Sequence, residues 1–220
     1  MEETNFVLLW KEQYEKIEQS LAINKRILKE TISQKAKSAL RPLVRIKAIG
    51  IVAAVIWLLL LGAALSFAIL QYSSAANYFI VSVAAIFLIN VKALYDYIKH
   101  LAWVNNINYD GSITEIQKKL VRLQLSIFQH VRVTFLQLPF WTTFYLSDKW
   151  FPQGVSWMYI IFQMLFTASF IYIAFWLNKN ISLKNADRKW VQVLIQGAGG
   201  KSVNKALEFY KEIEEFNEVE

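Results

Sequence analysis

The stretch "AIGIVAAVIWLLLLGAALSFAIL", Ala48 to Leu70, decides the fold, because its twenty-three residues include no charged side chain. An α-helix rises about 1.5 Å per residue, so this run is longer than the roughly 30 Å hydrocarbon core of a bilayer. A soluble domain would instead distribute its apolar residues among short patterned segments. The stretch therefore predicts a transmembrane helix.

Three further apolar runs follow it in a chain that is 55% hydrophobic and 15% aromatic. Together the runs predict four spans, at about 48–70, 77–95, 128–147 and 155–177. Loops of roughly seven residues separate spans one and two, and spans three and four, so each pair is expected to form an antiparallel hairpin. The sequence thus predicts an all-α integral membrane protein, a four-helix bundle made of two hairpins.

The predicted organisation has three parts. They are an N-terminal cytoplasmic amphipathic helix at 1–45, a membrane domain at 46–177 with a central cytoplasmic segment at 97–127, and cytoplasmic C-terminal helices at 178–220.

The distribution of Lys and Arg predicts the orientation. Of the 24 basic residues, 23 lie before span one, from Lys92 to Arg132 around the central segment, or after span four, whereas Lys149 lies in an outer loop. The positive-inside rule then places both termini and the central segment in the cytoplasm of a multi-pass protein of the inner cell membrane. Arg45, Lys47 and Arg132 are expected to anchor this topology against anionic lipid headgroups. Because the bilayer accounts for the net charge of +7, no nucleic-acid partner is expected.

The N-terminal segment carries an apolar stripe at three- and four-residue steps, which is typical of an amphipathic helix. The stripe consists of Trp10, Tyr14, Ile17, Leu21 and Leu28, with the amide of Asn24 on the same face. We expect the stripe to pack against the protein's own cytoplasmic helices, and an intermolecular coiled coil is the alternative.

A second cytoplasmic helix is predicted to begin at Ser112. Ser112 and Glu115 match the S-x-x-E capping box, and Gly111 before them supplies a turn. No Gly or Pro follows until Pro139, so the helix is expected to run without interruption into span three and to be kinked there. The glycines at 197–200 are predicted to separate two C-terminal helices.

Polar side chains inside the predicted spans are the candidate functional groups. In "SIFQHVRVTFLQLPFW", which begins at Ser126, extending the helical stripe places His130, Thr134 and Gln137 on a face turned into the bundle. Interhelical hydrogen bonding is the ordinary role of such groups. The candidates for a functional role are Gln137, Pro139, His130, Asn90 and Gln163.

Two short motifs contain residue types that occur in binding or catalytic sites. The segment "GAGGKS" resembles the end of a phosphate-binding loop, but Ile195 stands where the first glycine is required. Asp96, His100 and His130 could form a metal or proton-transfer site, although Asp96 also suits a plain ion pair with Lys92. We therefore predict no enzyme activity, no catalytic or metal-binding residue and no cofactor.

Three stretches carry a resemblance to a known family. They are "LLWKEQYEKIEQSL" (Leu8 to Leu21), "GSITEIQKKLVRL" (Gly111 to Leu123) and "IQGAGGKSVNKALEFYKEIEEF" (Ile195 to Phe216). They resemble an uncharacterised family of bacterial four-span integral membrane proteins, and the resemblance covers most of the chain. It implies the four-span topology and supplies no catalytic residues. Some members look like companions of sigma-factor regulators, which implies a role in signalling.

The sequence predicts a non-enzymatic regulator or scaffold that holds a cytosolic protein partner at the membrane through amphipathic helices. Nearly all of the polar chain is predicted to be cytoplasmic, which is the observation behind this hypothesis. Instead of binding a cytosolic partner, the same helices could associate with those of a second copy of the chain. The alternative function is a small transporter or channel subunit, with a pathway near Gln137 and the inner ends of spans two and three.

Overall fold

The computed structural model describes residues 2–109 and 111–218, with the side chains of residues 10–109 and 111–211. This part of the chain is helical throughout and contains no strand, which confirms the predicted all-α class. The helices are α1 (Glu2–Leu70), α2 (Asn77–Asn105), α3 (Ile113–Phe135), α4 (Trp157–Asn180), α5 (Lys189–Gln196) and α6 (Gly200–Glu218), with short 3₁₀ helices η1 (Ser74–Ala76), η2 (Leu138–Thr142) and η3 (Leu183–Asn185).

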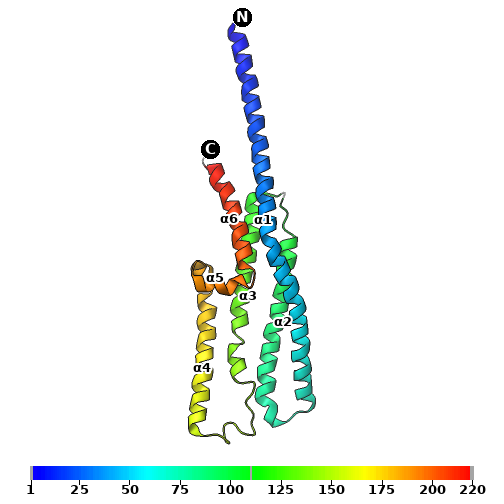
Figure 1. The fold of residues 1–220 in the computed structure, drawn as a ribbon, viewed down its shortest axis with the longest axis vertical. Helices are drawn as coiled ribbons and strands as arrows, with labels where there is room; N and C mark the ends of the chain where they lie inside the picture. The colour runs from blue at the N-terminus through cyan, green and yellow to red at the C-terminus, as the bar shows by residue number, and fades with distance from the viewer. Residues whose placement is uncertain (1, 110, 219–220) are drawn as a thin grey trace.

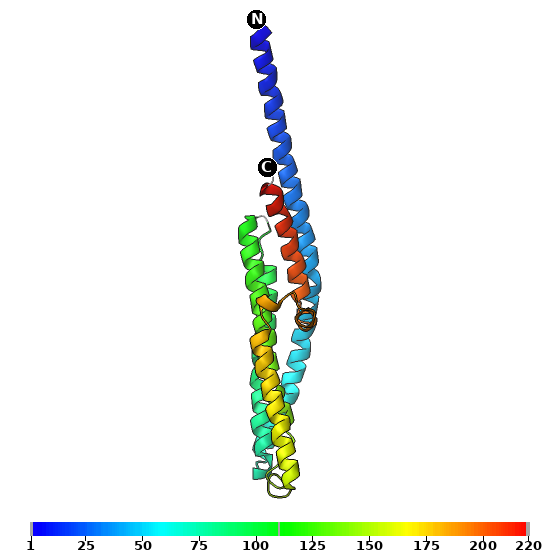
Figure 2. The same ribbon diagram turned by 90° about the vertical axis from the view of Figure 1, so that its left-hand side faces the viewer.

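The molecule is long and narrow, and α1 runs along most of it as one helix of 69 residues (Figures 1 and 2). The turn between α1 and α2 and the connection between α3 and α4 lie at one end, whereas α1 begins and α6 ends toward the other end. α5 lies across the long axis, and α6 then turns back beside α1 in both views. The chain therefore passes along the molecule repeatedly, with its helices side by side.

Three helical segments of the described chain are long and apolar enough to cross a membrane. They are Trp10–Leu70, Ser74–Asn105 and Trp157–Asn180, which correspond to the first, second and fourth predicted spans. Large apolar side chains such as Leu59, Leu60 and Phe67 are exposed on the apolar part of α1. Such an outward apolar surface suits lipid rather than water.

Beyond the apolar part of the bundle, α1, α2, α3, α5 and α6 contribute buried side chains to a hydrophobic core. α3 begins as predicted, because the Ser112 Oγ accepts a hydrogen bond from the Glu115 N–H at 3.2 Å. The buried members of the core include Ile32, Ala36, Leu40 and Leu43 from α1, Ile116, Leu120, Leu123 and Ile127 from α3, Val191 and Ile195 from α5, and Val203, Ala206 and Tyr210 from α6. Burial of these side chains joins the N-terminal, central and C-terminal segments into one packed unit.

α3 runs without interruption into the third predicted span, as expected, but it ends at Phe135 instead of continuing through a kink at Pro139. Pro139 has no N–H to bond the Phe135 carbonyl, and its ring would clash with that carbonyl in a continued helix. The chain instead forms η2, with the proline in its first turn, and reaches α4 through a series of turns. The third predicted span is therefore a broken segment rather than a kinked helix.

The N-terminal arm, which is the part of α1 before Leu28, also differs from the expectation. Trp10, Tyr14, Ile17 and Leu21 are 64%, 58%, 61% and 44% exposed, and Leu28 is the member of the stripe that packs against the core. The expectation of packing within the chain is therefore wrong for the first four residues of the stripe. The reason is length, because α1 extends past the other helices at this end of the molecule (Figures 1 and 2).

The glycine turn between α5 and α6 lies where it was predicted. Gly199 has a φ of 91°, which L side chains rarely adopt. A Cβ atom on Gly199 would lie 1.9 Å from the Cδ1 atom of Leu43 on α1. Gly197, two residues earlier, has a helical φ of −62°, and an added Cβ would meet nothing within 4 Å.

These geometries predict opposite outcomes for two matched substitutions. Gly199→Ala should lower the free energy of unfolding by about 2–4 kcal/mol, because it adds backbone strain and a clash with α1. Gly197→Ala should leave it unchanged or raise it by about 0.5 kcal/mol, because the residue is already helical. Thermal unfolding of the two variants in detergent micelles, followed by circular dichroism, measures the difference. Equal midpoints would contradict the close approach of the turn to α1.

Candidate functional site

Buried polar side chains gather where α1, α2 and α3 meet, between the hydrophobic core and the apolar part of the bundle. We call Lys47, Asp96, His100, Ser126 and His130 the polar cluster, and each of them is 6% exposed or less. Asp96 and His100 are one helical turn apart on α2, and Ser126 and His130 are one turn apart on α3, so each pair shares a helix face. The structure thus brings together residues from three helices.

Asp96 is the acidic centre of the cluster. Its carboxylate accepts hydrogen bonds from the ammonium groups of Lys92 and Lys99, the latter at 3.0 Å. The Nδ1 atom of His130 lies 3.4 Å from the same carboxylate. The predicted ion pair with Lys92 is therefore present, and it belongs to a larger network. A buried carboxylate is costly unless such partners compensate for its lost hydration.

Lys47 is buried and does not face lipid headgroups, which corrects its predicted role as an anchor. Its Nζ atom lies 4.2 Å from the centroid of the Tyr97 ring, a cation–π contact, and has no hydrogen-bond partner among the described residues. Lys47 follows Leu43 by four residues, so it continues the buried face of α1. Arg45 lies on another face of the helix and is exposed. The spacing from the core residues was the signal that the sequence analysis missed.

The two histidines complete the cluster. The Nε2 atom of His100 lies 2.8 Å from the Ser126 Oγ, and its Nδ1 atom has no hydrogen-bond partner among the described residues. The imidazole rings of His100 and His130 are 6.0 Å apart, measured between their centroids. The cluster therefore holds an ammonium group, a carboxylate and two imidazoles, which are groups that can exchange protons.

Asn90 and Gln137, two of the candidate residues, contact each other across the bundle. The Asn90 Nδ2 donates to the Gln137 Oε1 at 3.0 Å and to the Ile86 carbonyl at 2.8 Å. Gln137 lies just past the end of α3, so this contact ties the start of the broken segment to α2. This is the interhelical hydrogen bonding that the sequence favours for such amides.

Gln163 on α4 supports the broken segment from the other side. Its side chain is buried, its Nε2 donates to the Thr142 carbonyl at 2.7 Å, and its Oε1 accepts from the Tyr145 hydroxyl at 2.9 Å. The Thr142 Oγ1 in turn donates to the Pro139 carbonyl at 2.7 Å. These bonds supply partners for two backbone carbonyls where the α-helical ladder is interrupted, which lowers the cost of the break.

Arg132, one of the expected topology anchors, makes a contact within the protein. It is half-buried, and its Nε donates to the carbonyl of Ile181, the residue that ends α4. The contact ties the middle of the chain to the entrance of the C-terminal segment.

No group of three or more His, Asp and Glu side chains suited to a metal ion occurs in the part of the chain that the structure describes. The segment "GAGGKS" forms the turn and first residues of α6, with α5 rather than a strand before it. The polar cluster brings together groups that can exchange protons, and Gln163 and Thr142 donate hydrogen bonds to backbone carbonyls of the broken segment.

The network predicts that Asp96 and Lys47 are energetically coupled. Asp96→Asn should cost about 2–3 kcal/mol of unfolding free energy, because charge-assisted hydrogen bonds are lost. In a Lys47→Met background the cost should be smaller by about 1 kcal/mol, because one buried ammonium no longer needs the carboxylate. Thermal unfolding in micelles gives the unfolding free energies of the wild type, the two single variants and the double variant. Arg45→Met, at an exposed position, is the control. Strict additivity of the two substitutions would rule out the coupling.

Comparisons with protein-family models, curated proteins and solved structures find no match for this chain. The resemblance to bacterial four-span proteins therefore stays an expectation from the sequence. Functional inference rests on the geometry described above.

Proposed function

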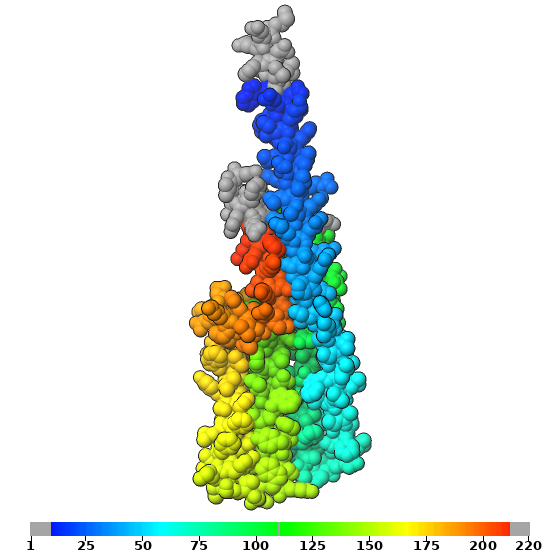
Figure 3. Space-filling model, viewed as in Figure 1, coloured from blue at the N-terminus to red at the C-terminus, as the bar shows by residue number. Residues whose placement is uncertain are grey.

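We propose that this chain is a non-enzymatic integral membrane protein that holds a cytosolic protein partner at the inner cell membrane. The observation that carries the proposal is the exposed apolar stripe on the N-terminal arm. Figure 3 shows the arm, in dark blue, standing clear of the orange and red helices of the C-terminal segment.

The stripe has the composition of a helix face that packs against another protein surface. Trp10, Tyr14, Ile17 and Leu21 are large apolar residues on one face of a helix that has no neighbour there in the described chain. A helix gains most of its stability in water from burying its apolar face, and a contiguous exposed apolar face marks an interaction site. The arm therefore gains stability when a partner covers it.

The fitting occupant is an amphipathic helix of a cytosolic protein. Four-residue steps from Leu28 lead to Ile32, Ala36 and Leu40, so the stripe continues the face of α1 that packs in the core. α6 lies beside α1 in the core, and a partner helix would extend the same helix-to-helix packing along the arm.

The membrane placement supports this function. We place four crossings in the bilayer, with the segment after α3 as the broken third crossing and both termini in the cytoplasm. Three apolar helices, the 23-to-1 distribution of basic residues and the common end of the two hairpin connections favour this arrangement (Figure 1). The arm then projects into the cytosol, where a soluble protein can reach it.

The stripe variant Ile17→Glu with Leu21→Glu tests the proposal in the full chain. Buried charges would oppose packing, so the amount of partner co-purified after cross-linking in membranes should fall about tenfold or more. The control Gln19→Glu with Ala22→Glu adds the same charges away from the stripe and should retain the partner.

Two results would refute the proposal that the arm binds a cytosolic protein. One is the same set of cross-linked proteins with and without the stripe substitutions. The other is a wild-type protein that is dimeric in micelles, becomes monomeric in the stripe variant and captures nothing else. That result would assign the stripe to a second copy of the chain.

The broken third crossing favours a second candidate function, a small transporter or channel subunit. Discontinuous helices and polar side chains at membrane depth line the pathways of many transporters. Here Asn90, Gln137 and Gln163 surround the break. The transporter hypothesis predicts flux of protons or monovalent cations through proteoliposomes that Gln137→Leu abolishes without lowering the unfolding temperature. Flux no greater than that of empty vesicles would exclude this candidate for those ions.

A further inference from the structure

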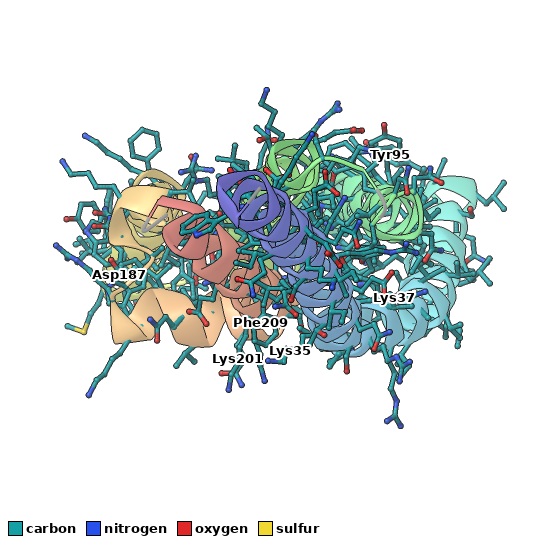
Figure 4. The ribbon with its side chains drawn as sticks, turned by 90° about the horizontal axis from the view of Figure 1, so that it is seen from above. Lys35, Lys37, Tyr95, Asp187, Lys201 and Phe209 are labelled. Carbon is teal, nitrogen blue, oxygen red and sulfur yellow. The ribbon has the colours of Figure 1, made fainter. Side chains whose placement is uncertain are left out.

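A groove of about 560 Å³ lies between α1 and the corner formed by α5 and α6. Lys35 enters it from α1, and Lys201 and Lys205 enter it from α6. Figure 4 shows Lys35, Lys201 and Phe209 close together on one side of the molecule. Neither Asp nor Glu occurs among the described residues that line the groove. Its wall is therefore basic.

The lysines converge on a shared surface. The Nζ atoms of Lys35 and Lys205 lie 5.9 Å and 6.0 Å from the centroid of the same ring, that of Phe209. Other lysines of the chain have acidic partners, as Lys99 has in Asp96 and Lys119 has in Glu115. Within the described residues, by contrast, none of the three groove lysines forms a salt bridge. The groove therefore gathers three positive charges, two of them beside the same ring, with no salt bridge to offset them among the described residues.

Hydroxyl and apolar groups complete the groove. Ser38 and Ser202 line it and provide hydrogen-bond donors, whereas Pro42, Ile46 and Phe209 form an apolar floor. Lysine ammonium groups with hydroxyl donors are typical ligands of phosphate. An apolar floor beside them suits an organic group attached to that phosphate.

The groove also reaches the proposed membrane surface. Lys35 and Ile46 are eleven residues apart, or about 16 Å along α1. Ile46 lies two residues before the apolar run of Ala48–Leu70, so the lower end of the groove is at the level expected of lipid headgroups. The ligand can therefore come from the membrane or from solution.

We propose that this groove binds a phosphate group, held by Lys35, Lys201 and Lys205. A soluble phosphate compound and an anionic phospholipid share this chemistry. The site is independent of the partner-binding arm, since it lies beside α6 and uses other residues.

The test uses the full chain in micelles and in nanodiscs. Inorganic phosphate, titrated by calorimetry into the micellar protein, probes the soluble source. Nanodiscs of phosphatidylcholine with and without phosphatidic acid, analysed by native mass spectrometry for retained lipid, probe the membrane source. The triple variant Lys35→Gln, Lys201→Gln, Lys205→Gln should bind the phosphate-bearing probe about tenfold or more weakly, because charge-assisted hydrogen bonds are lost.

Lys37→Gln is the matched control. Lys37 is two residues from Lys35 on α1 but lines a different hollow, with Asn108 and Tyr109, so its loss should change affinity less than about twofold. Binding of inorganic phosphate assigns the site to soluble ligands, and binding of phosphatidic acid alone assigns it to lipid. Binding of neither probe overturns the proposal. So does an equal loss of affinity in the control and the triple variant, or undiminished binding by a triple variant that unfolds at the wild-type temperature.

Discussion

A backbone N–H or C=O group in hydrocarbon has no water to bond, and this constraint shapes the membrane part of the proposed arrangement. α1, α2 and α4 satisfy it internally as continuous helices. The segment after Phe135 cannot, because Pro139 ends the helical ladder. Gln163 from α4 therefore bonds the Thr142 carbonyl, and Asn90 from α2 bonds the side chain of Gln137. Gln163 thus supplies a partner for a carbonyl of the segment that Pro139 interrupts, and the Asn90–Gln137 contact joins the start of that segment to α2.

α1 contributes residues to each of the features on which the functional proposals rest. It bears the exposed stripe of the arm, one wall of the basic groove, Lys47 of the polar cluster and the apolar run that enters the bundle. Lys35 and Lys47 are twelve residues apart, which is about 18 Å along the helix. The groove and the polar cluster are therefore separate sites on the one helix that also forms the arm.

The candidate site was only partly predictable. The sequence identified three of its members, because Asp96 and His100 are four apart on one helix face and His130 lies at the same inner end of the predicted bundle. Lys47 was assigned to lipid, since a basic residue beside an apolar run ordinarily anchors topology. The structure buries it against Tyr97 instead, because it continues the face of Leu43. The positive-inside rule uses only the charge of Lys47 and its position beside the apolar run, and it takes no account of the helices that pack on that face of α1.

The sequence by itself determined the helical class, the apolar helices around Ala48–Leu70, the start of α3 at Ser112 and the glycine turn before α6. These features depend on residue type and on spacing within one segment, which is local information. The tertiary structure alone decided that α3 stops at Phe135, that Arg132 bonds Ile181, and that the stripe from Trp10 to Leu21 is left uncovered. Each of these depends on where other helices end or what bonds they offer, which no single segment encodes.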